Sequence, residues 1–187
     1  VYPLPSKLDP NNTTIALAEG AHARSKDTTG GILSILLWNG MISPEICVSP
    51  SEANAKIKVD AGYEFAKPAG AAKPDQAMWD PKFAGTPDDA SARTPGVGNN
   101  SYAHTLPLGQ RQALWSSTFN STEAVLGNRG PGYQRVTKPR LGWTLNPSGA
   151  TPPGADSITL KIHGKPNTWE GNIAYNDCHV NFETRPD

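Results

Sequence analysis

The sequence lacks any long hydrophobic run. A membrane-spanning helix needs roughly 20 consecutive apolar residues, whereas the longest run here extends only from Ile35 to Trp38. The chain also lacks net charge, because 17 acidic residues balance 17 basic ones without any block of like sign. A neutral, evenly mixed chain has no electrostatic footprint for nucleic acid or for an anionic membrane surface. We therefore expect no nucleic-acid partner and no direct membrane contact by these residues.

Catalytic motifs are missing as well. No Gly-x-Ser-x-Gly nucleophile elbow occurs. The segment Gly96-Val97-Gly98 is not followed by the glycine and helix of a phosphate-binding loop. Carboxylates that could pair for glycoside hydrolysis are present, but no spacing selects two of them. The sequence predicts a protein that is not an enzyme, with a metal-dependent hydrolase as the least favoured alternative.

Cysteine is scarce, with only Cys47 and Cys178 present. In an exported protein these two residues could form a disulfide. The bridge would close a long loop and contribute on the order of 4–5 kcal/mol. The other interpretation is two independent buried thiols. Because the spacing matches no usual zinc motif, both alternatives stay open.

Glycine and proline are abundant, at 18 residues each in a chain of 187. This composition predicts one loop-rich domain over residues 1–187. Residues 1–12 combine prolines with an Asp-Pro-Asn-Asn turn signal, which is typical of an extended linker. Residues 67–100 have frequent prolines and no regular period, so they predict a long irregular loop, anchored by Trp79 and Phe83.

Two segments carry helix signals. The apolar residues within 32–39 share one side of a helix, and Gly40 stands where a C-terminal cap belongs. Ser49 is followed three residues later by Glu52, with Pro50 between them, and this capping-box pattern predicts a second helix start.

Strand signals lie mostly in the second half of the chain. Residues 101–106 and 123–126 indicate short strands, and the second of these is ended by glycine and proline. Apolar residues alternate over residues 158–162, which predicts a half-buried strand. A further alternation, on both sides of a polar dipeptide near residue 177, predicts a C-terminal hairpin.

The C-terminal residues 157–187 also carry a family resemblance. They contain His163, a spacer, and then Asp177-Cys178-His179-Val180. This arrangement resembles the C-terminal signature of prepilin-type and pseudopilin-like proteins abundant in Planctomycetes, in which a histidine and a spacer precede Asp-Gly-His-Val. The segments 36–52, 101–104 and 123–131 look similar to the same family. Cys178 replaces the glycine of the family pattern, and the spacer is longer than in the family.

The resemblance implies an α+β fold, in which short N-terminal helices pack on an antiparallel sheet that ends in the C-terminal hairpin. It implies a non-enzymatic structural subunit of a type IV pilus or a type II secretion pseudopilus. Such a subunit is exported to the cell envelope or the extracellular surface. Its partners are other pilin-like subunits, which it meets through an apolar N-terminal helix. Because this chain starts at Val1 with no such helix, we expect it to be the head that follows the anchor.

Two registers of the hairpin compete. If Asn176-Asp177 is the turn, both turn residues tolerate a positive φ, and Tyr175 faces Cys178. If Asp177-Cys178 is the turn, as the family pattern suggests, Cys178 needs a positive φ, which is costly for a residue with a Cβ. Both registers put the apolar side chains on one face. We favour the first, which would point Cys178 at the core.

Metal ligands can be named, although no cofactor is expected. His163, Asp177 and His179 are the candidate ligands for zinc, and the competing interpretation is a hydrogen-bonded surface cluster. A loop that is rich in aspartate is the candidate for calcium, but it lacks the twelve-residue calcium-loop pattern. Its acidic residues are Asp75, Asp80, Asp88 and Asp89.

Aromatic side chains suggest an alternative function. The five tryptophans are Trp38, Trp79, Trp115, Trp143 and Trp169. Aromatic faces stack on sugars, so these residues raise the alternative of a surface carbohydrate-binding module on the same scaffold. The competing interpretation, which we favour, is that they fill a core that has little Leu and Phe.

Overall fold

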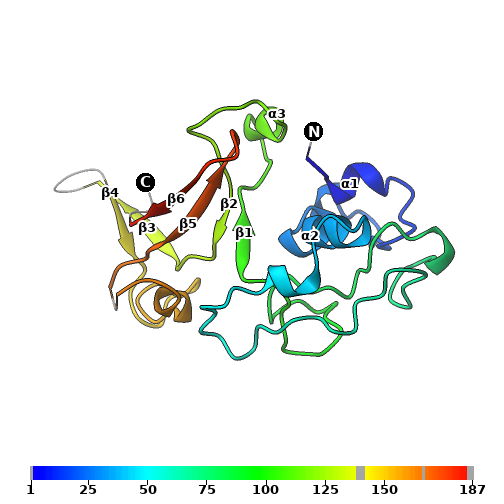
Figure 1. Ribbon diagram of the computed structural model, residues 1–187, viewed down its shortest axis with the longest axis horizontal. Coiled ribbons are helices and arrows are strands. Elements are labelled where there is room, and N and C mark those ends of the chain that lie inside the picture. Colours follow the sequence, from blue (N-terminus) through cyan, green and yellow to red (C-terminus); the bar gives the residue numbers. More distant parts are fainter. Residues whose placement is uncertain (1, 138–141, 166, 185–187) are drawn as a thin grey trace. The chain divides into compact units, whose positions relative to one another are not determined.

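The computed structural model describes residues 2–137, 142–165 and 167–184. The fold is α+β, with short helices and an antiparallel sheet (Figure 1). The chain divides into two compact units, one made of Val1–Ser49 with Ala55–Ser101 and the other of Pro50–Asn54 with Tyr102–Asp187. The expectation of a single domain stays a prediction. No helix among the described residues has the length and apolar character that crossing a bilayer requires.

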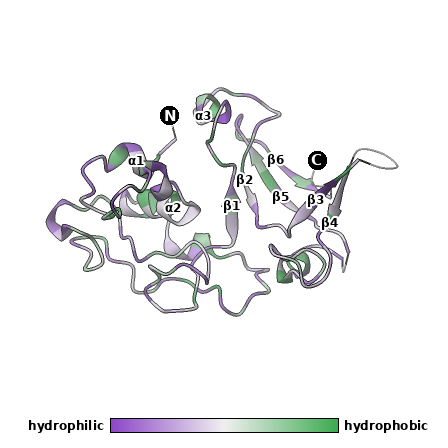
Figure 2. Ribbon diagram, turned by 180° about the vertical axis from the view of Figure 1, so that it is seen from behind, coloured by the Kyte–Doolittle hydropathy of each residue, from purple (hydrophilic) through white to green (hydrophobic). Residues whose placement is uncertain are grey.

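The first unit is built around helix α2, Thr29–Trp38. Thr28 caps the helix, because its hydroxyl accepts a hydrogen bond from the backbone N of Gly31 at 3.0 Å. The chain then leaves the helix at Gly40, which has a φ of +66°. The helix predicted over residues 32–39 is therefore confirmed, and it starts one turn earlier. Figure 2 shows the hydrophobic residues that α2 contributes to this unit.

The core of the first unit lies against α2. Leu33, Leu37, Cys47, Tyr63 and Phe83 form one buried cluster. The remaining helices are short: α1 covers Pro5–Leu8, and 3-10 turns cover Ala23–Lys26, Pro44–Cys47 and Pro74–Gln76. Burying these side chains is the main favourable term in folding a unit with so little regular structure.

Residues 1–12 are expected as an extended linker, but residues 2–12 are folded as part of the first unit. Proline starts α1, and Asp9 directly after the helix is 1% exposed. The Asp9 carboxylate accepts hydrogen bonds from the backbone N of Thr13 at 2.6 Å and of Thr14 at 3.1 Å. It also pairs with the fully buried ammonium group of Lys26 at 3.0 Å. A buried ion pair offsets its desolvation cost only with good geometry and further hydrogen bonds, which the folded segment after Asp9 supplies.

In the stretch 67–100 the only helix or strand is the 3-10 turn Pro74–Gln76, and the two aromatic residues expected to anchor it are buried. Trp79 is 0% exposed and Phe83 is 3% exposed. The loop also approaches α2 closely, because a Cβ on Gly30 would lie only 2.7 Å from the backbone N of Gly85. Arg93 adds a charged anchor by pairing with the buried carboxylates of Asp60, at 3.2 Å, and Asp80.

The second helix expected from Ser49 is wrong. Residues 50 and 51 form only a turn, and the preceding 3-10 turn ends at Cys47. The two halves of the capping box bond elsewhere. The backbone N of Ser49 donates to Ser101 Oγ at 3.0 Å, while the Glu52 carboxylate pairs with Arg129 at 2.7 Å. The pattern therefore does not start a helix in this fold.

The second unit holds a four-stranded antiparallel sheet of order β1-β2-β5-β6 (Figure 1). Its strands are β1 Tyr102–His104, β2 Ala124–Asn128, β5 Gly171–Tyr175 and β6 Val180–Glu183. A separate two-stranded sheet pairs β3 Tyr133–Val136 with β4 Gly142–Leu145. The helix α3, Arg111–Leu114, follows β1. The strands predicted at 101–106 and 123–126 are confirmed as β1 and β2.

The strand predicted at 158–162 is wrong, because Ile158–Lys161 forms a 3-10 turn. Ser157 Oγ accepts a hydrogen bond from Thr159 N at 3.4 Å, a local bond that competes with strand pairing. Leu160 and Ile162 are nevertheless buried, at 4% and 6% exposed, while Ile158 is 38% exposed. The alternation thus reports the burial of two of its three apolar residues but not the backbone conformation.

The C-terminal hairpin is present, but neither predicted register is correct. Tyr175 faces His179, because the Tyr175 backbone N donates to the His179 carbonyl at 3.0 Å. The loop has three residues, Asn176 to Cys178. The Cys178 backbone N donates to the Tyr175 carbonyl at 3.0 Å, and Cys178 itself has a φ of +71°. A type I turn followed by one left-handed residue is a common three-residue hairpin loop.

This register changes which side chains share a face of the hairpin. A one-residue shift moves each side chain of one strand to the other face relative to its partner. Val180 and Phe182 therefore lie on the face opposite to Tyr175, and they are 59% and 52% exposed. Cys178 is exposed and Cys47 is buried, and both thiols are free, so the disulfide alternative is not realised.

Candidate ligand-binding groove

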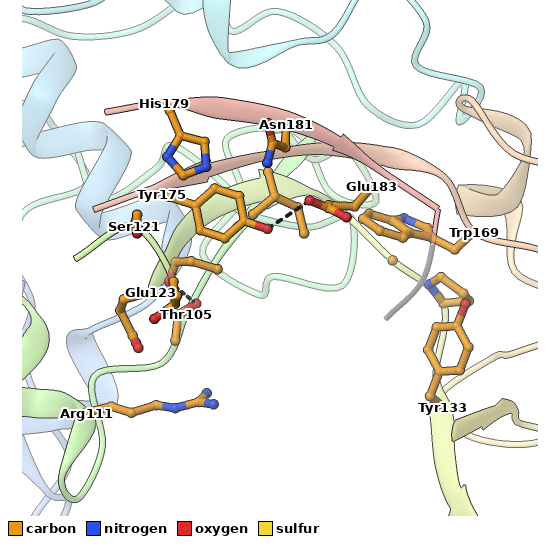
Figure 3. A pocket seen from close by; sticks show the side chains of 15 residues that line it. Thr105, Arg111, Ser121, Glu123, Tyr133, Trp169, Tyr175, His179, Asn181 and Glu183 are labelled. Atoms are coloured by element: carbon orange, nitrogen blue, oxygen red, sulfur yellow. Dashed lines mark hydrogen bonds between the residues drawn. The ribbon is translucent and has the colours of Figure 1, made fainter. Parts of the chain in front are cut away.

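A groove of about 660 Å³ opens on one face of the sheet in the second unit. Its floor is the β5–β6 hairpin, and its two sides are the segment 121–124 with Arg111 and the segment 130–133 with Trp169. Figure 3 shows Arg111 and Tyr133 on opposite sides of this space, with Tyr175 and Glu183 between them along the sheet. A concave surface with polar and aromatic side chains is the default candidate for a binding site.

The floor begins with two stacked rings. Tyr175 and His179 are parallel, with their centroids 4.4 Å apart and an interplanar angle of 5°. They stack because the three-residue loop makes them direct cross-strand neighbours. His179 is further oriented by Asp177, which accepts bonds from its backbone N at 3.2 Å and from its ring Nδ1. Either of the predicted registers would have put His179 on the face opposite to Tyr175.

The acid–base properties of the floor follow from these contacts. Tyr175 donates to the Glu183 carboxylate at 3.1 Å. Desolvation raises the pKa of Tyr175, and the hydrogen bond and negative charge of Glu183 raise this pKa further. Desolvation also raises the pKa of the Asp177 carboxyl, but the bonds from His179 outweigh it, so that this pKa lies below its ordinary value. The Asp177 carboxyl is therefore held in its charged form at neutral pH.

Asn176 fixes one side of the groove to the hairpin. Its side chain is 1% exposed and donates to the carbonyl of Ser116 at 2.7 Å. The same side chain accepts from the backbone N of Thr118 at 2.7 Å and of Phe119 at 3.0 Å. These bonds hold the loop that follows α3, and α3 begins with Arg111. The turn of the hairpin thus positions the arginine at the groove.

The other side of the groove is rigid because Trp169 is locked in place. The ring is 6% exposed, and its Nε1 donates to the Arg129 carbonyl at 3.2 Å. Its edges lie against glycines, since a Cβ on Gly171 would lie 2.6 Å from Trp169 Cζ2. Burial raises the pKa of the neighbouring Tyr133, opposed by a hydrogen bond from the Trp169 backbone. Trp169 therefore supports the groove, and Tyr133 presents the more accessible ring.

Several polar side chains at the groove are available to a ligand. Within the part of the chain that the structure describes, Arg111, Ser121, Glu123 and Asn181 have no side-chain hydrogen bond or ion pair. Together they offer a guanidinium, a hydroxyl, a carboxylate and an amide. Such a mixture of donors and acceptors beside aromatic rings suits a ligand that carries many hydroxyl groups. No nucleophile paired with a general base stands out among these groups.

The structure separates the three candidate zinc ligands. Asp177 and His179 pair with each other, whereas His163 contacts Ser51 Oγ at 3.3 Å and packs edge-on against Phe182. Over residues 2–137, 142–165 and 167–184, no cluster of three or more His, Cys, Asp or Glu residues is placed to hold a metal ion. The predicted set is therefore not assembled as a site.

The candidate calcium aspartates are also used elsewhere. Asp80 is 0% exposed and bonds to Arg93, to the backbone N of Glu64 at 2.9 Å and to that of Lys82 at 2.9 Å. Asp75 forms an exposed pair with Lys67, and Asp89 accepts from Ser91. Asp80 thus has a structural role, which the sequence pattern alone did not distinguish from metal binding.

The tryptophans divide into buried and exposed residues. Trp79, Trp115 and Trp169 are buried, as the core interpretation predicts, and Trp38 is partly buried. Trp143, in contrast, is 52% exposed in the middle of β4.

The groove residues Arg111, Tyr133 and Glu183 were not singled out by the sequence, because nothing local marks them. Only the aromatic count indicated a surface of this kind.

No protein-family model, no curated protein and no solved structure gives a significant match to this chain.

Proposed function

We propose that this chain is a non-enzymatic, pilin-like or pseudopilin-like subunit of the bacterial cell envelope. The observation that carries the proposal is the backbone at Cys178, where φ is +71°. Cys178 stands where the resembling family has the glycine of Asp-Gly. Glycine is the residue that adopts this conformation without steric cost. A backbone conformation that favours glycine at this position supports the resemblance independently of the identical residues in the sequence.

A second feature supports the same proposal. The Asp-x-His part of the pattern, Asp177 to His179, lies at the turn of one antiparallel hairpin in a four-stranded sheet, while His163 precedes that hairpin. An antiparallel sheet that ends in this hairpin is the architecture that the resemblance implies. Proteins of this class assemble through an apolar N-terminal helix, so the proposed partners are further pilin-like subunits.

The proposal is tested by locating the protein in its source cells. An antibody raised against this chain should label the cell surface or surface filaments in immunogold microscopy, and it should detect the protein in the envelope fraction. A matched antibody against a cytoplasmic enzyme provides the control. Detection only in the cytoplasmic fraction would overturn the proposal.

The groove favours a second candidate function, carbohydrate binding on the same scaffold. The observation that favours it is the group of unpaired polar side chains beside the Tyr133 and Tyr175 rings. A glycan array probed with the labelled chain tests this function, and the Arg111→Ala variant serves as the control for binding in the groove. Binding that Arg111→Ala weakens supports it, whereas an array without signal contradicts it.

A further inference from the structure

A second hollow adjoins the groove in the same unit. It measures about 390 Å³ and shares the side chains of Tyr133 and Trp169 with the groove. Its other walls include Trp143 and Leu145 of β4 and Asn167. Because two side chains line both spaces, the hollow and the groove are neighbours across the Tyr133 ring. Together they offer a longer surface than the groove alone.

The exposed ring of Trp143 distinguishes this hollow. Trp143 pairs with Arg135 across the β3–β4 ladder, and Tyr133 pairs with Leu145 two residues further along. Directly paired residues and their second neighbours share one face of a ladder, so Tyr133 and Trp143 lie on the same face. A tryptophan that is 52% exposed forgoes much of the stabilisation that its burial would bring. An exposed ring of this kind is available for a ligand.

We propose that the groove and the hollow together bind one oligosaccharide, with a sugar ring stacked on Trp143 and further units reaching past Tyr133 into the groove. This inference rests on the second candidate function above. The groove supplies hydrogen bonds through Arg111, Glu123 and Asn181, and the hollow supplies the apolar platform. Sugars combine both requirements, because their rings have apolar faces and hydroxyl edges.

The charges select among oligosaccharides. The groove presents one guanidinium, on Arg111, and two carboxylates, on Glu123 and Glu183. This balance disfavours polyanionic chains such as sulfated glycans, because their charge would meet the carboxylates. The ligand is therefore a neutral oligosaccharide, and cello- and chito-oligosaccharides serve as probes of that class.

The test is calorimetric titration with cello- and chito-oligosaccharides, from monosaccharide to hexasaccharide. The hexasaccharide should bind more tightly than the disaccharide. Trp143→Ala should weaken hexasaccharide binding about tenfold, the order of one aromatic contact, and leave disaccharide binding unchanged. Phe65→Ala is the matched control, because Phe65 is 55% exposed and lines neither space.

The outcomes separate the two levels of the proposal. In one outcome, saccharides bind with an affinity that Arg111→Ala lowers but that neither chain length nor Trp143→Ala changes. That result overturns the extended site and leaves the groove function standing. If neither these oligosaccharides nor any glycan on the array binds to the wild-type chain, both are overturned. Because Trp143 is exposed, its variant should keep the melting temperature of the wild type, so a loss of binding will not reflect unfolding.

Discussion

Cys178 is the residue at which local propensity and observed geometry conflict. Its φ of +71° is the conformation that favours glycine, and a side chain with a Cβ adopts it at a cost of roughly 1–2 kcal/mol. The register of the hairpin depends on this residue, because the third loop position makes Tyr175 and His179 partners. The strand position predicted for Cys178 would avoid this cost, which is why the local propensity favours that register.

Replacing Cys178 by glycine should therefore stabilise the protein. Removing the Cβ relieves the strain, while the greater freedom of glycine in the unfolded chain offsets part of the gain, so we expect about 1 kcal/mol. Urea denaturation of Cys178→Gly and of the control Cys178→Ala measures the effect. Alanine keeps the strain and should change little. A glycine variant less stable than the wild type would show that the cysteine side chain contributes contacts of its own.

The two thiols should differ in reactivity. Cys47 is 1% exposed, and burial, with a smaller contribution from the charge of Glu45, raises its pKa to about 11. The thiolate is the reactive form, so Cys47 should be inert at neutral pH, whereas the exposed Cys178 should react. Labelling with a thiol reagent should modify one cysteine in the native chain and both in denaturant. Protection of both until a reductant is added would instead indicate a disulfide.

At the scale of elements, some parts of the fold could be predicted from local signals. Helix α2 was predictable because its apolar period and its Gly40 cap are both local. The backbone of residues 158–162 was not predictable, because the alternating apolar residues suggest a strand. The local hydrogen bond of Ser157 accompanies a 3-10 turn there instead. The groove could not be predicted, since Arg111, Tyr133 and Glu183 meet only through strand order and the bonds of Asn176. These depend on tertiary pairing rather than on sequence spacing.

Trp169 should be an essential support of the second unit. Because the ring is 6% exposed and bonded to the Arg129 carbonyl, Trp169→Ala removes a buried ring and should cost about 3–5 kcal/mol. The matched variant Trp143→Ala, at an exposed ring, should change stability by less than about 0.5 kcal/mol. Thermal denaturation of both variants is the measurement. Equal melting temperatures would contradict the assignment of Trp169 to the support of the groove.

The Asp9–Lys26 pair should link the folded N-terminal segment to pH. Desolvation raises the pKa of Asp9, but bonds from the Ile15 backbone, Lys26 and Thr13 outweigh it, so this pKa lies below its ordinary value. A group with a lowered pKa contributes stability above its unfolded pKa of about 3.9, and this stability is lost as the pH falls through the folded value.

Asp9→Asn should therefore cost about 3–5 kcal/mol at neutral pH, because the buried Lys26 ammonium loses its carboxylate and keeps only the Asp9 carbonyl as an acceptor. The difference from the wild type should shrink as the pH falls below about 4. Urea titrations at several pH values measure it, with Asp75→Asn, at an exposed pair, as the control. A difference that does not depend on pH would show that Asp9 is not charged in the folded state.

At the scale of the whole molecule, we propose that the folded chain, with its candidate groove, acts as a subunit in the cell envelope. The chain has no net charge to draw it to nucleic acid or to an anionic surface. The proposed assembly instead depends on an apolar helix in front of this head. The groove and the Trp143 hollow would then face a ligand outside the cell.

The measurement that tests the central claim most directly is the sequence of the native protein upstream of Val1. Mass spectrometry of the protein isolated from the envelope fraction gives its mature N-terminus. The sequence of its gene gives the encoded residues upstream of Val1. The account predicts a prepilin cleavage site followed by an apolar helix of roughly 20 residues leading into Val1. A mature protein that begins at or near Val1 without such a helix, or a gene without the cleavage site, would contradict the pilin-like proposal.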